Sequence, residues 1–308
     1  MKFLLPLLLF SMINTPGCGT VKSAYKAGTD SVASLTKKVM PGKKAILKKR
    51  TLVFPIMNQS IVSDKKIAEM TETLVQILSK NDHLFVIKSE EEIPTERDIK
   101  SPEFGVVLDP KTTQHAEEMG VDVVITLVLN PMEVSIVRTG IWPLRKFKRE
   151  IETSTALNAL NVINGTLYLT HIETREIRLK EEVWEEDMDN WEFDENMIAG
   201  ELNDMLEDHA EALLNILDVN PWSGKIIGSD DNGICRINGG RDIGIAVDNV
   251  FEVFDKGEPI RSASGREYFL RGNKVGELII REVLQDQATA APVDDGRFEV
   301  GQIVRLKK

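Results

Sequence analysis

Hydrophobic and polar positions are patterned differently in successive parts of the chain. An apolar run, Phe3–Ile13, precedes a Lys-rich stretch with few bulky apolar residues. Across 51–219, apolar runs of strand length alternate with apolar positions spaced three or four apart, as on one face of an α-helix. Across 220–308, short alternating runs are cut by turn signals such as DDNG, GG and DKG. The pattern predicts a leader, a tether and two folded domains.

The segment 51–219 predicts an α/β sheet domain. A strand at Thr51–Met57 leads into a helix that begins at Ser63 or Asp64. The apolar face of this helix consists of Ile67, Met70, Leu74, Ile77 and Leu78. The other expected elements are strands at 83–89, 121–130, 132–138 and 148–174, a short helix ending at Gly120, and a helix along 198–217. This order predicts a sheet with helices packed on it.

The segment 220–308 predicts a small all-β domain, because turn signals separate strand-length alternations at short intervals. A barrel or barrel-like roll is the expected architecture. The whole chain is therefore expected to be of the α+β class.

The N-terminus predicts export and a lipid anchor. Phe3–Ile13 is shorter than the ~20 apolar residues of a membrane-spanning helix but has the length of a signal-peptide core. Gly17 precedes Cys18, and the stretch resembles a bacterial lipoprotein signal, which implies that Cys18 becomes the lipid-bearing (palmitate-type) first residue. The expected boundaries are a signal peptide at 1–17 and a lipidated tether at 18–50. An ordinary secretory signal with an incidental cysteine is the alternative.

Charge is distributed unevenly along the chain. Between residues 21 and 50, eight lysines and Arg50 oppose only Asp30, which gives a net charge of +8. Because the whole chain carries −11 and Lys2 adds one positive charge, residues 51–308 carry −20. A basic tether next to an anionic bilayer gains about 1 kcal/mol per cation near the surface. A solvated linker without membrane contact is the alternative, and an exported protein is not expected to bind nucleic acid.

Candidate catalytic and metal-binding residues are sparse. The four histidines, His83, His115, His171 and His209, are isolated in sequence and lack the spacing of a zinc or iron site. His209 is expected either to pair with Asp208 or Glu211 or to lie on the flank of its helix. Cys235 is expected to face a core. The sequence thus predicts no metal, no cofactor and no enzymatic activity.

A dense basic patch, residues 138–150, stands out in the acidic body. Trp142, Arg145, Lys146 and Lys148 are candidates for a membrane or partner contact, since Trp and clustered cations favour the interface of an anionic bilayer. The alternative is a hairpin whose cations pair with the acidic run at 181–195.

Candidate protein contacts in the C-terminal domain are Trp222, Arg241, Phe254 and Tyr268, because small turn-rich barrels bind through loops and exposed edges. The alternative for each aromatic residue is a place in the core.

Two resemblances extend over most of 51–308. The first part resembles the α/β domain shared by the TolB amino-terminal region, curli-secretion lipoproteins and the middle of flagellar assembly protein T. The matching positions are Pro55, Asn58, Ser60, Phe85, Val86, Ala116, Gly120 and Asp122. The second part resembles the C-terminal domain of flagellar assembly protein T. The matching positions there are Asn238, Gly240, Gly244, Phe251, Val253, Gly301 and Val304.

These resemblances imply a scaffold and a non-enzymatic role. The expected function is a lipid-anchored periplasmic adaptor that helps assemble or stabilise an envelope complex, flagellar or otherwise part of a surface structure. The alternatives are an oligomeric curli-like secretion pore component, which makes the chain a candidate homo-oligomer, and an enzyme with an unrecognised site. Gly19, and not Asp, follows Cys18. By resemblance to the sorting of enteric lipoproteins this implies the outer membrane, with the body facing the periplasm.

Overall fold

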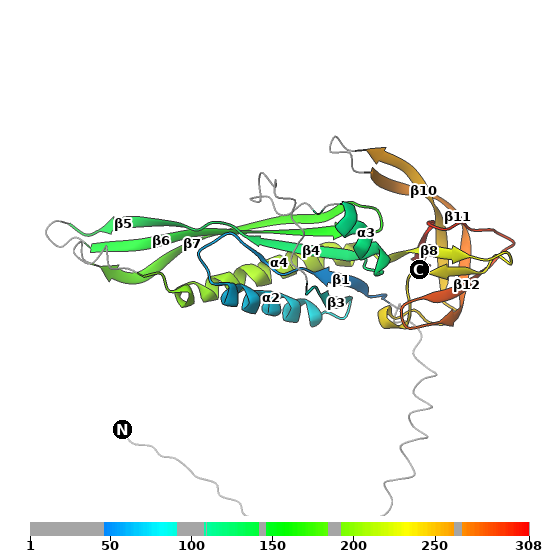
Figure 1. Cartoon of the computed structure of the whole chain (residues 1–308), viewed down its shortest axis with the longest axis horizontal. Coiled ribbons are helices and arrows are strands. Elements are labelled where there is room, and N and C mark those ends of the chain that lie inside the picture. Colours follow the sequence, from blue (N-terminus) through cyan, green and yellow to red (C-terminus); the bar gives the residue numbers. More distant parts are fainter. Residues whose placement is uncertain are drawn as a thin grey trace, which may run out of the picture. The chain divides into compact units, whose positions relative to one another are not determined.

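The computed structural model describes residues 46–90, 108, 110–141, 146–183, 192–261 and 267–307 (Figure 1). The chain divides into two compact units, Met1–Lys44 and Ala45–Lys308, and the described residues all belong to the second. The predicted signal peptide, Cys18 and most of the predicted tether lie outside the described residues.

The described elements follow the predicted order of a mixed domain and then an all-β domain. In chain order they are β1 (Lys49–Val53), β2 (Met57–Asn58), α2 (Asp64–Ser79), β3 (Leu84–Lys88), α3 (Pro110–Glu118), β4 (Val123–Leu129), β5 (Glu133–Thr139), β6 (Lys146–Asn161), β7 (Leu167–Val183), η3 (Glu195–Met197), α4 (Ala199–Val219), β8 (Ser223–Ser229), β9 (Cys235–Ile237), η4 (Arg241–Ile243), β10 (Val250–Arg261), β11 (Glu267–Val283), β12 (Ala288–Pro292) and β13 (Ile303–Leu306).

The first domain is a seven-stranded mixed sheet. Its strand order is β3-β1-β4-β6-β5, with β2 paired to β4 and β7 paired to β6. β1 runs parallel to β3 and β4, whereas β6 is antiparallel to β4, β5 and β7. The sheet-with-helices architecture expected from the sequence is confirmed.

Helix α2 begins where its sequence predicts. The Ser63 hydroxyl accepts a hydrogen bond from the Lys66 backbone N–H at 3.2 Å, which satisfies one of the free donors of the first turn. Glu195 accepts hydrogen bonds from both the backbone N–H and the hydroxyl of Ser63, each at 2.9 Å, and so ties the start of α2 to the turn before α4.

Within the described chain, no helix is both long and apolar enough to cross a membrane.

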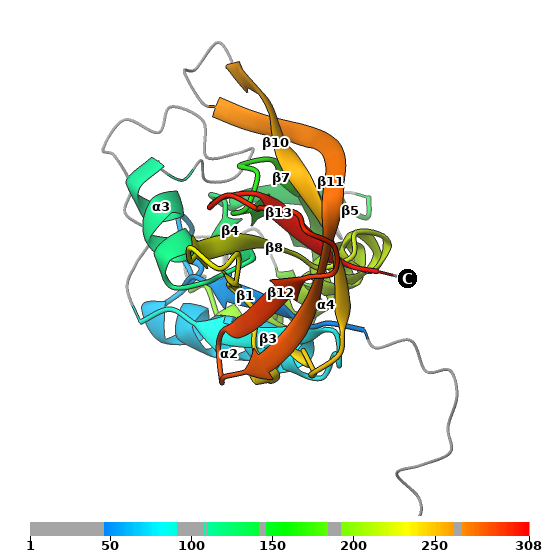
Figure 2. The ribbon, with the colours of Figure 1, turned by 90° about the vertical axis from the view of Figure 1, so that its right-hand side faces the viewer.

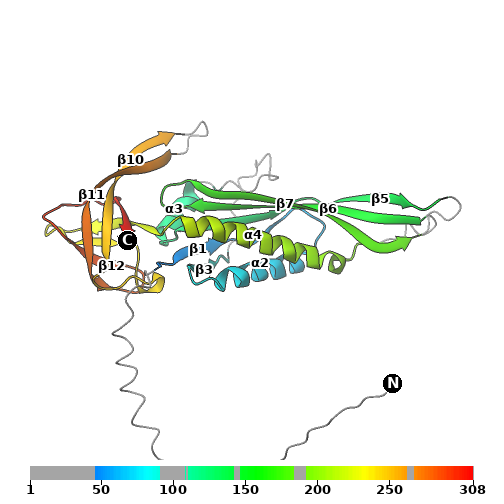
Figure 3. The same cartoon turned by 180° about the vertical axis from the view of Figure 1, so that it is seen from behind.

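Both faces of the sheet are covered at β1 and β4, whereas one face of β7 is exposed. Helices α2 and α4 lie side by side on one face (Figures 1 and 3), where Leu74, Leu127, Leu157 and Leu206 are part of one continuous core. On the opposite face, Ala116 near the end of α3 packs in a second core with strand side chains that point away from α2 and α4. The alternation along the strands thus buries side chains on both sides, as strands covered by helices require.

The second domain is a closed six-stranded barrel in the order β10-β11-β12-β9-β8-β13, which faces the viewer in Figure 2. Its core contains Trp222 and Phe251, whose rings meet edge to face with centroids 6.0 Å apart, and the buried Cys235. The barrel predicted from the turn spacing is confirmed.

Arg50 joins the barrel to the sheet. It lies in β1, and its guanidinium forms a bidentate ion pair with the Asp242 carboxylate at 2.7 and 2.9 Å. Its other N–H groups donate to the carbonyl oxygens of Gly120, Asn238 and Asp286 at 3.1, 2.7 and 2.7 Å. All five guanidinium donors are therefore used, one by the sheet domain and four by the barrel.

Asp122 is a second junction residue, fully enclosed between the domains. Its Oδ2 accepts hydrogen bonds from the Arg50 backbone N–H at 2.8 Å and from Trp222 Nε1–H of the barrel at 3.1 Å, while Oδ1 has no partner. Burial raises the pKa of Asp122 to about 7. Lys49, whose pKa burial lowers to about 8, donates from Nζ to the Leu217 carbonyl at 2.7 Å and links β1 to α4.

The segment that enters the fold also belongs to both domains. Leu47 is buried in the barrel core, and the Lys48 backbone N–H donates to the Ile243 carbonyl of the barrel at 2.9 Å. On another part of the junction, Ile163 from the β6–β7 turn packs with Phe254 and Ile303 of the barrel. The entering chain thus packs against the barrel at Leu47 and joins the sheet two residues later, at Lys49.

Two details differ from the sequence-based expectations, and a further hairpin adds to the fold. Lys49 and Arg50, expected in the tether, are in β1, which begins two residues before Thr51. The expected long strand at 148–174 is two strands, β6 and β7, joined by a turn. Besides β6–β7 there is a second long hairpin, β10–β11, and beyond Phe254 the described part of β10 pairs only with β11.

Gly240 provides a test of how tightly the junction is packed. A Cβ at this position would collide with the backbone carbonyl of Gln285 and the backbone N of Asp286, the residue whose carbonyl binds Arg50. We expect Gly240→Ala to lower the free energy of unfolding by about 2 kcal/mol, because backbone rather than a flexible side chain must move.

The matched control is Gly200→Ala in the first turn of α4, where an added Cβ meets no atom within 4 Å. It should raise the free energy of unfolding by up to about 1 kcal/mol through helix propensity. Urea denaturation of both variants measures the two values, and equal effects would contradict the packing described here.

Candidate functional site

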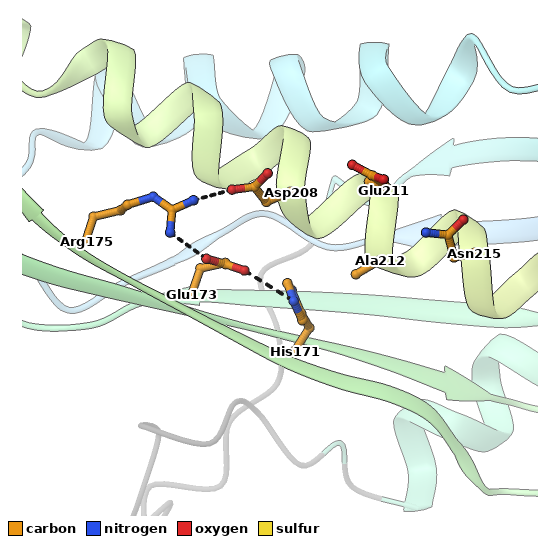
Figure 4. Close-up of a pocket in the computed structure, with 7 residues that line it drawn as sticks. All are labelled: His171, Glu173, Arg175, Asp208, Glu211, Ala212 and Asn215. Carbon is orange, nitrogen blue, oxygen red and sulfur yellow. Dashed lines mark hydrogen bonds and ion pairs between the residues drawn. The ribbon is translucent and has the colours of Figure 1, made fainter.

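A pocket of about 380 Å³ lies between β7 and α4 (Figure 4). Alternate residues of β7, His171, Glu173 and Arg175, point toward the helix because strand side chains repeat every second residue. The lining is completed by four residues of α4: Asp208, Glu211, Ala212 and Asn215. Three carboxylates, one guanidinium and one imidazole therefore converge on the pocket.

The charged groups of the pocket hold one another in place. Arg175 forms ion pairs with Glu173 Oε2 at 2.7 Å and with Asp208, so that it links β7 to α4 (Figure 4). Glu173 Oε1 lies 3.2 Å from His171 Nε2. Glu211 forms no ion pair with any described residue, and it leaves an unpaired carboxylate at the rim.

A chain of hydrogen bonds continues from His171 into the core. His171 Nδ1 is 2.9 Å from His209 Nδ1, and His209 Nε2 is 2.7 Å from Thr155 Oγ1. Because Glu173 only accepts, a neutral His171 donates from Nε2 and accepts at Nδ1. His209 then donates from Nδ1 and accepts the Thr155 hydroxyl proton at Nε2. Every polar hydrogen of the chain has an acceptor in this arrangement.

His209 is held neutral by its surroundings. Burial, and after it the positive charge that the neighbouring His171 and Arg175 can carry, lowers its pKa to about 3. If both imidazoles were protonated, two like charges would be in contact. The pair therefore acts as a fixed polar brace between β6, β7 and α4.

The hydroxyl group of the hydrogen-bonded chain is shielded from solvent. Thr155 is the one hydroxyl in the hydrogen-bonded chain, and it is fully buried beneath α4, so a substrate cannot reach it. Among the described residues no group of three or more His, Cys, Asp or Glu is arranged to hold a metal ion. What the pocket presents to solvent is a set of oriented carboxylates.

The four contact residues predicted in the barrel differ in where the structure places them. Trp222 and Phe254 are buried, which corrects their expected role as surface contacts: Trp222 donates to Asp122, and Phe254 packs against Ile163 with Arg305 over its ring. Arg241 is exposed at the start of η4 and donates to the Val283 carbonyl at 3.2 Å. Tyr268 is in β11, opposite Ile260.

The basic loop is described only in part. Trp142 and Arg145 lie outside the described residues. Lys146 and Lys148 are in β6, half-buried, and both have interaction partners. Arg138 lies over the ring of Phe147 at 5.8 Å.

The histidine pair was not predicted. His171 and His209 are 38 positions apart, and only the packing of α4 on β7 brings them together. A signal for His209 is present in the sequence, since it occurs four residues before Leu213 and three after Leu206 on the apolar face of its helix. It is buried on that face instead of lying on the helix flank or pairing with Asp208 or Glu211.

Comparisons with known proteins give a distant fold likeness. No family model matches the chain, and no curated protein matches its sequence. Among solved structures, lipoprotein GNA1162 from Neisseria meningitidis matches with 12% identity and a TM-score of 0.28, over 56% of this chain and 99% of its own. A PelC dodecamer from Paraburkholderia phytofirmans matches with 13% identity and a TM-score of 0.27, over 44% of this chain and 78% of its own.

TolB from Acinetobacter baumannii matches a longer part of this chain, 84%, together with 50% of its own length, at 10% identity and a TM-score of 0.31. The expected resemblance to TolB and to envelope lipoproteins is thus present as a distant structural likeness. At these identities and TM-scores it carries no information about function.

The buried His209 predicts a pH dependence of stability. An unfolded histidine has a pKa near 6.5 and His209 in the fold has a pKa of about 3, so the unfolded chain binds more protons between these values. As the pH is lowered from 8 to 5, the free energy of unfolding should therefore decrease by about 2 kcal/mol from this group. Asp122, whose pKa is raised to about 7, acts in the opposite direction over the same range.

The His209 effect is therefore measured as the difference between wild type and His209→Gln. That difference should shrink by about 2 kcal/mol from pH 8 to pH 5, because only wild type has the buried imidazole. His115→Gln, which replaces a side chain that is 65% exposed, tests whether loss of any histidine has the same effect. Parallel stability curves for wild type and His209→Gln would contradict the assignment.

Proposed function

We propose that this protein is a lipid-anchored adaptor of the bacterial cell envelope, which faces the periplasm and holds a partner protein during assembly of an envelope complex. The observation that carries the proposal is how the chain enters its fold. Leu47 is in the barrel core and Arg50 ties β1 to the barrel, so the last residues of the predicted tether are part of the fold. A force on the anchor is therefore delivered to the junction of both domains at once.

The finer part of the proposal is the kind of complex. The resemblance of both domains to flagellar assembly protein T favours a flagellar or other surface structure, and Gly19 after Cys18 favours the outer membrane. The adaptor binds by surface contacts and performs no chemistry. Its buried Thr155 and neutral His209 support this, because neither presents a reactive group to solvent.

A secretion pore is the less favoured function. A pore that crossed the membrane with β6 would need one apolar face toward lipid. The face that alternates through Ile151, Thr153 and Thr155 to Leu157 and Ala159 is buried, and its apolar members are in the same core as α2 and α4. Homo-oligomerisation by other surfaces is compatible with the adaptor.

The anchor is tested with the two cysteines of the chain. Cys18→Ser should release the protein from the membrane fraction into the soluble periplasmic fraction or leave an uncleaved precursor, and should abolish labelling by a palmitate analogue. Cys235→Ser is the matched control, because Cys235 is buried in the barrel. It should leave labelling and fractionation unchanged. Labelling that survives Cys18→Ser, or an unlabelled wild type, would overturn the anchor.

A further inference from the structure

The outer edge of β7 is the longest unpaired strand edge in the described part of the chain. β7 has 17 residues and pairs with β6 along one side, and no described strand pairs with its other side. The other sheet edges, β3 and β5, have five and seven residues. A long strand edge presents a row of free backbone donors and acceptors to any extended chain.

The pocket lies beside this edge and gives it a chemical preference. His171, Glu173 and Arg175 of β7 face α4, and Asp208 and Glu211 face them from the helix. Arg175 neutralises one carboxylate charge of the pair Glu173 and Asp208, so that a net negative charge remains with Glu211. The pocket therefore favours a cationic side chain.

The opposite side of β7 has a different character. Thr170, Ile172 and Thr174 occupy the alternate positions that point away from α4, and all three are exposed. Ile172 and Leu167 are exposed large apolar side chains at 42% and 52%. An added strand would meet acids on one of its faces and apolar surface on the other.

We propose that the outer edge of β7 binds an extended segment of the partner protein as an additional strand, with Lys or Arg at alternate positions entering the acidic pocket and apolar residues between them lying beside Ile172. This inference rests on the proposed adaptor function and names the kind of partner. Backbone hydrogen bonds along the edge supply affinity, and the pocket selects the alternating cations. Like-charged acidic strands are excluded by the same carboxylates.

The probe for this site is a short fluorescein-labelled peptide in which lysine and valine alternate, titrated with the full-length mature protein and followed by fluorescence anisotropy. Glu211→Lys should weaken binding about tenfold or more, because it reverses the unpaired charge of the pocket. Glu299→Lys makes the same change of total charge at an exposed position of the barrel and should leave binding unchanged.

Backbone pairing is tested with two N-methylated forms of the peptide. Methyl groups on alternate amides block hydrogen bonding along one edge of an added strand, so one form should bind and the form methylated at the other amides should not. Equal binding of both forms, equal effects of Glu211→Lys and Glu299→Lys, or no binding of the unmodified peptide would each overturn the proposal. Normal retention of the protein at the membrane in those cases would leave the anchored-adaptor function standing.

Discussion

The buried ion pair between Arg50 and Asp242 is the interaction on which the arrangement of the molecule depends. Both side chains are nearly inaccessible, at 5% and 7% exposure, and the guanidinium has no donor left over. Taking two charges out of water costs several kcal/mol per ion, and only good geometry with further hydrogen bonds offsets that cost. Loss of either side chain would leave the other charge buried and unpaired.

The same junction would connect the proposed anchor to the candidate binding surface. Leu47 fixes the incoming chain in the barrel, Arg50 fixes β1 between barrel and sheet, and Lys49 holds the Leu217 carbonyl near the end of α4. Helix α4 in turn forms one wall of the acidic pocket through Asp208 and Glu211. The described part of the path from the entering chain to the pocket thus runs through a few buried, hydrogen-bonded residues, which is what the proposed adaptor function requires.

Local signals in the sequence were sufficient for the element order and the fold class. The period of Ile67, Met70 and Leu74 locates α2, and Ser63 caps it as predicted. Gly120 ends the turn after α3 with a positive φ of 71°, which glycine adopts at low cost. Closely spaced turn signals were enough to predict the barrel.

Long-range pairings could not be predicted in the same way. Arg50 reads as one more cation of a basic tether, because its partner Asp242 is 192 positions away. His171 and His209 each look isolated for the same reason. Trp222 follows a proline and was expected at the surface, but its ring packs on Phe251 in the barrel core and its N–H donates to the enclosed Asp122. Charge and aromaticity in a sequence do not reveal whether the fold buries the side chain.

The most direct measurement of this account is a double-mutant cycle on the junction, with Arg50→Met, Asp242→Leu and the double variant compared by urea denaturation. Each single change leaves one buried charge unpaired and should lower the free energy of unfolding by about 3–5 kcal/mol. The double change should cost less than the sum by about 2 kcal/mol or more, since it removes both charges. Additive losses, with a coupling energy below about 0.5 kcal/mol, would contradict the claim that this pair holds the barrel to the sheet.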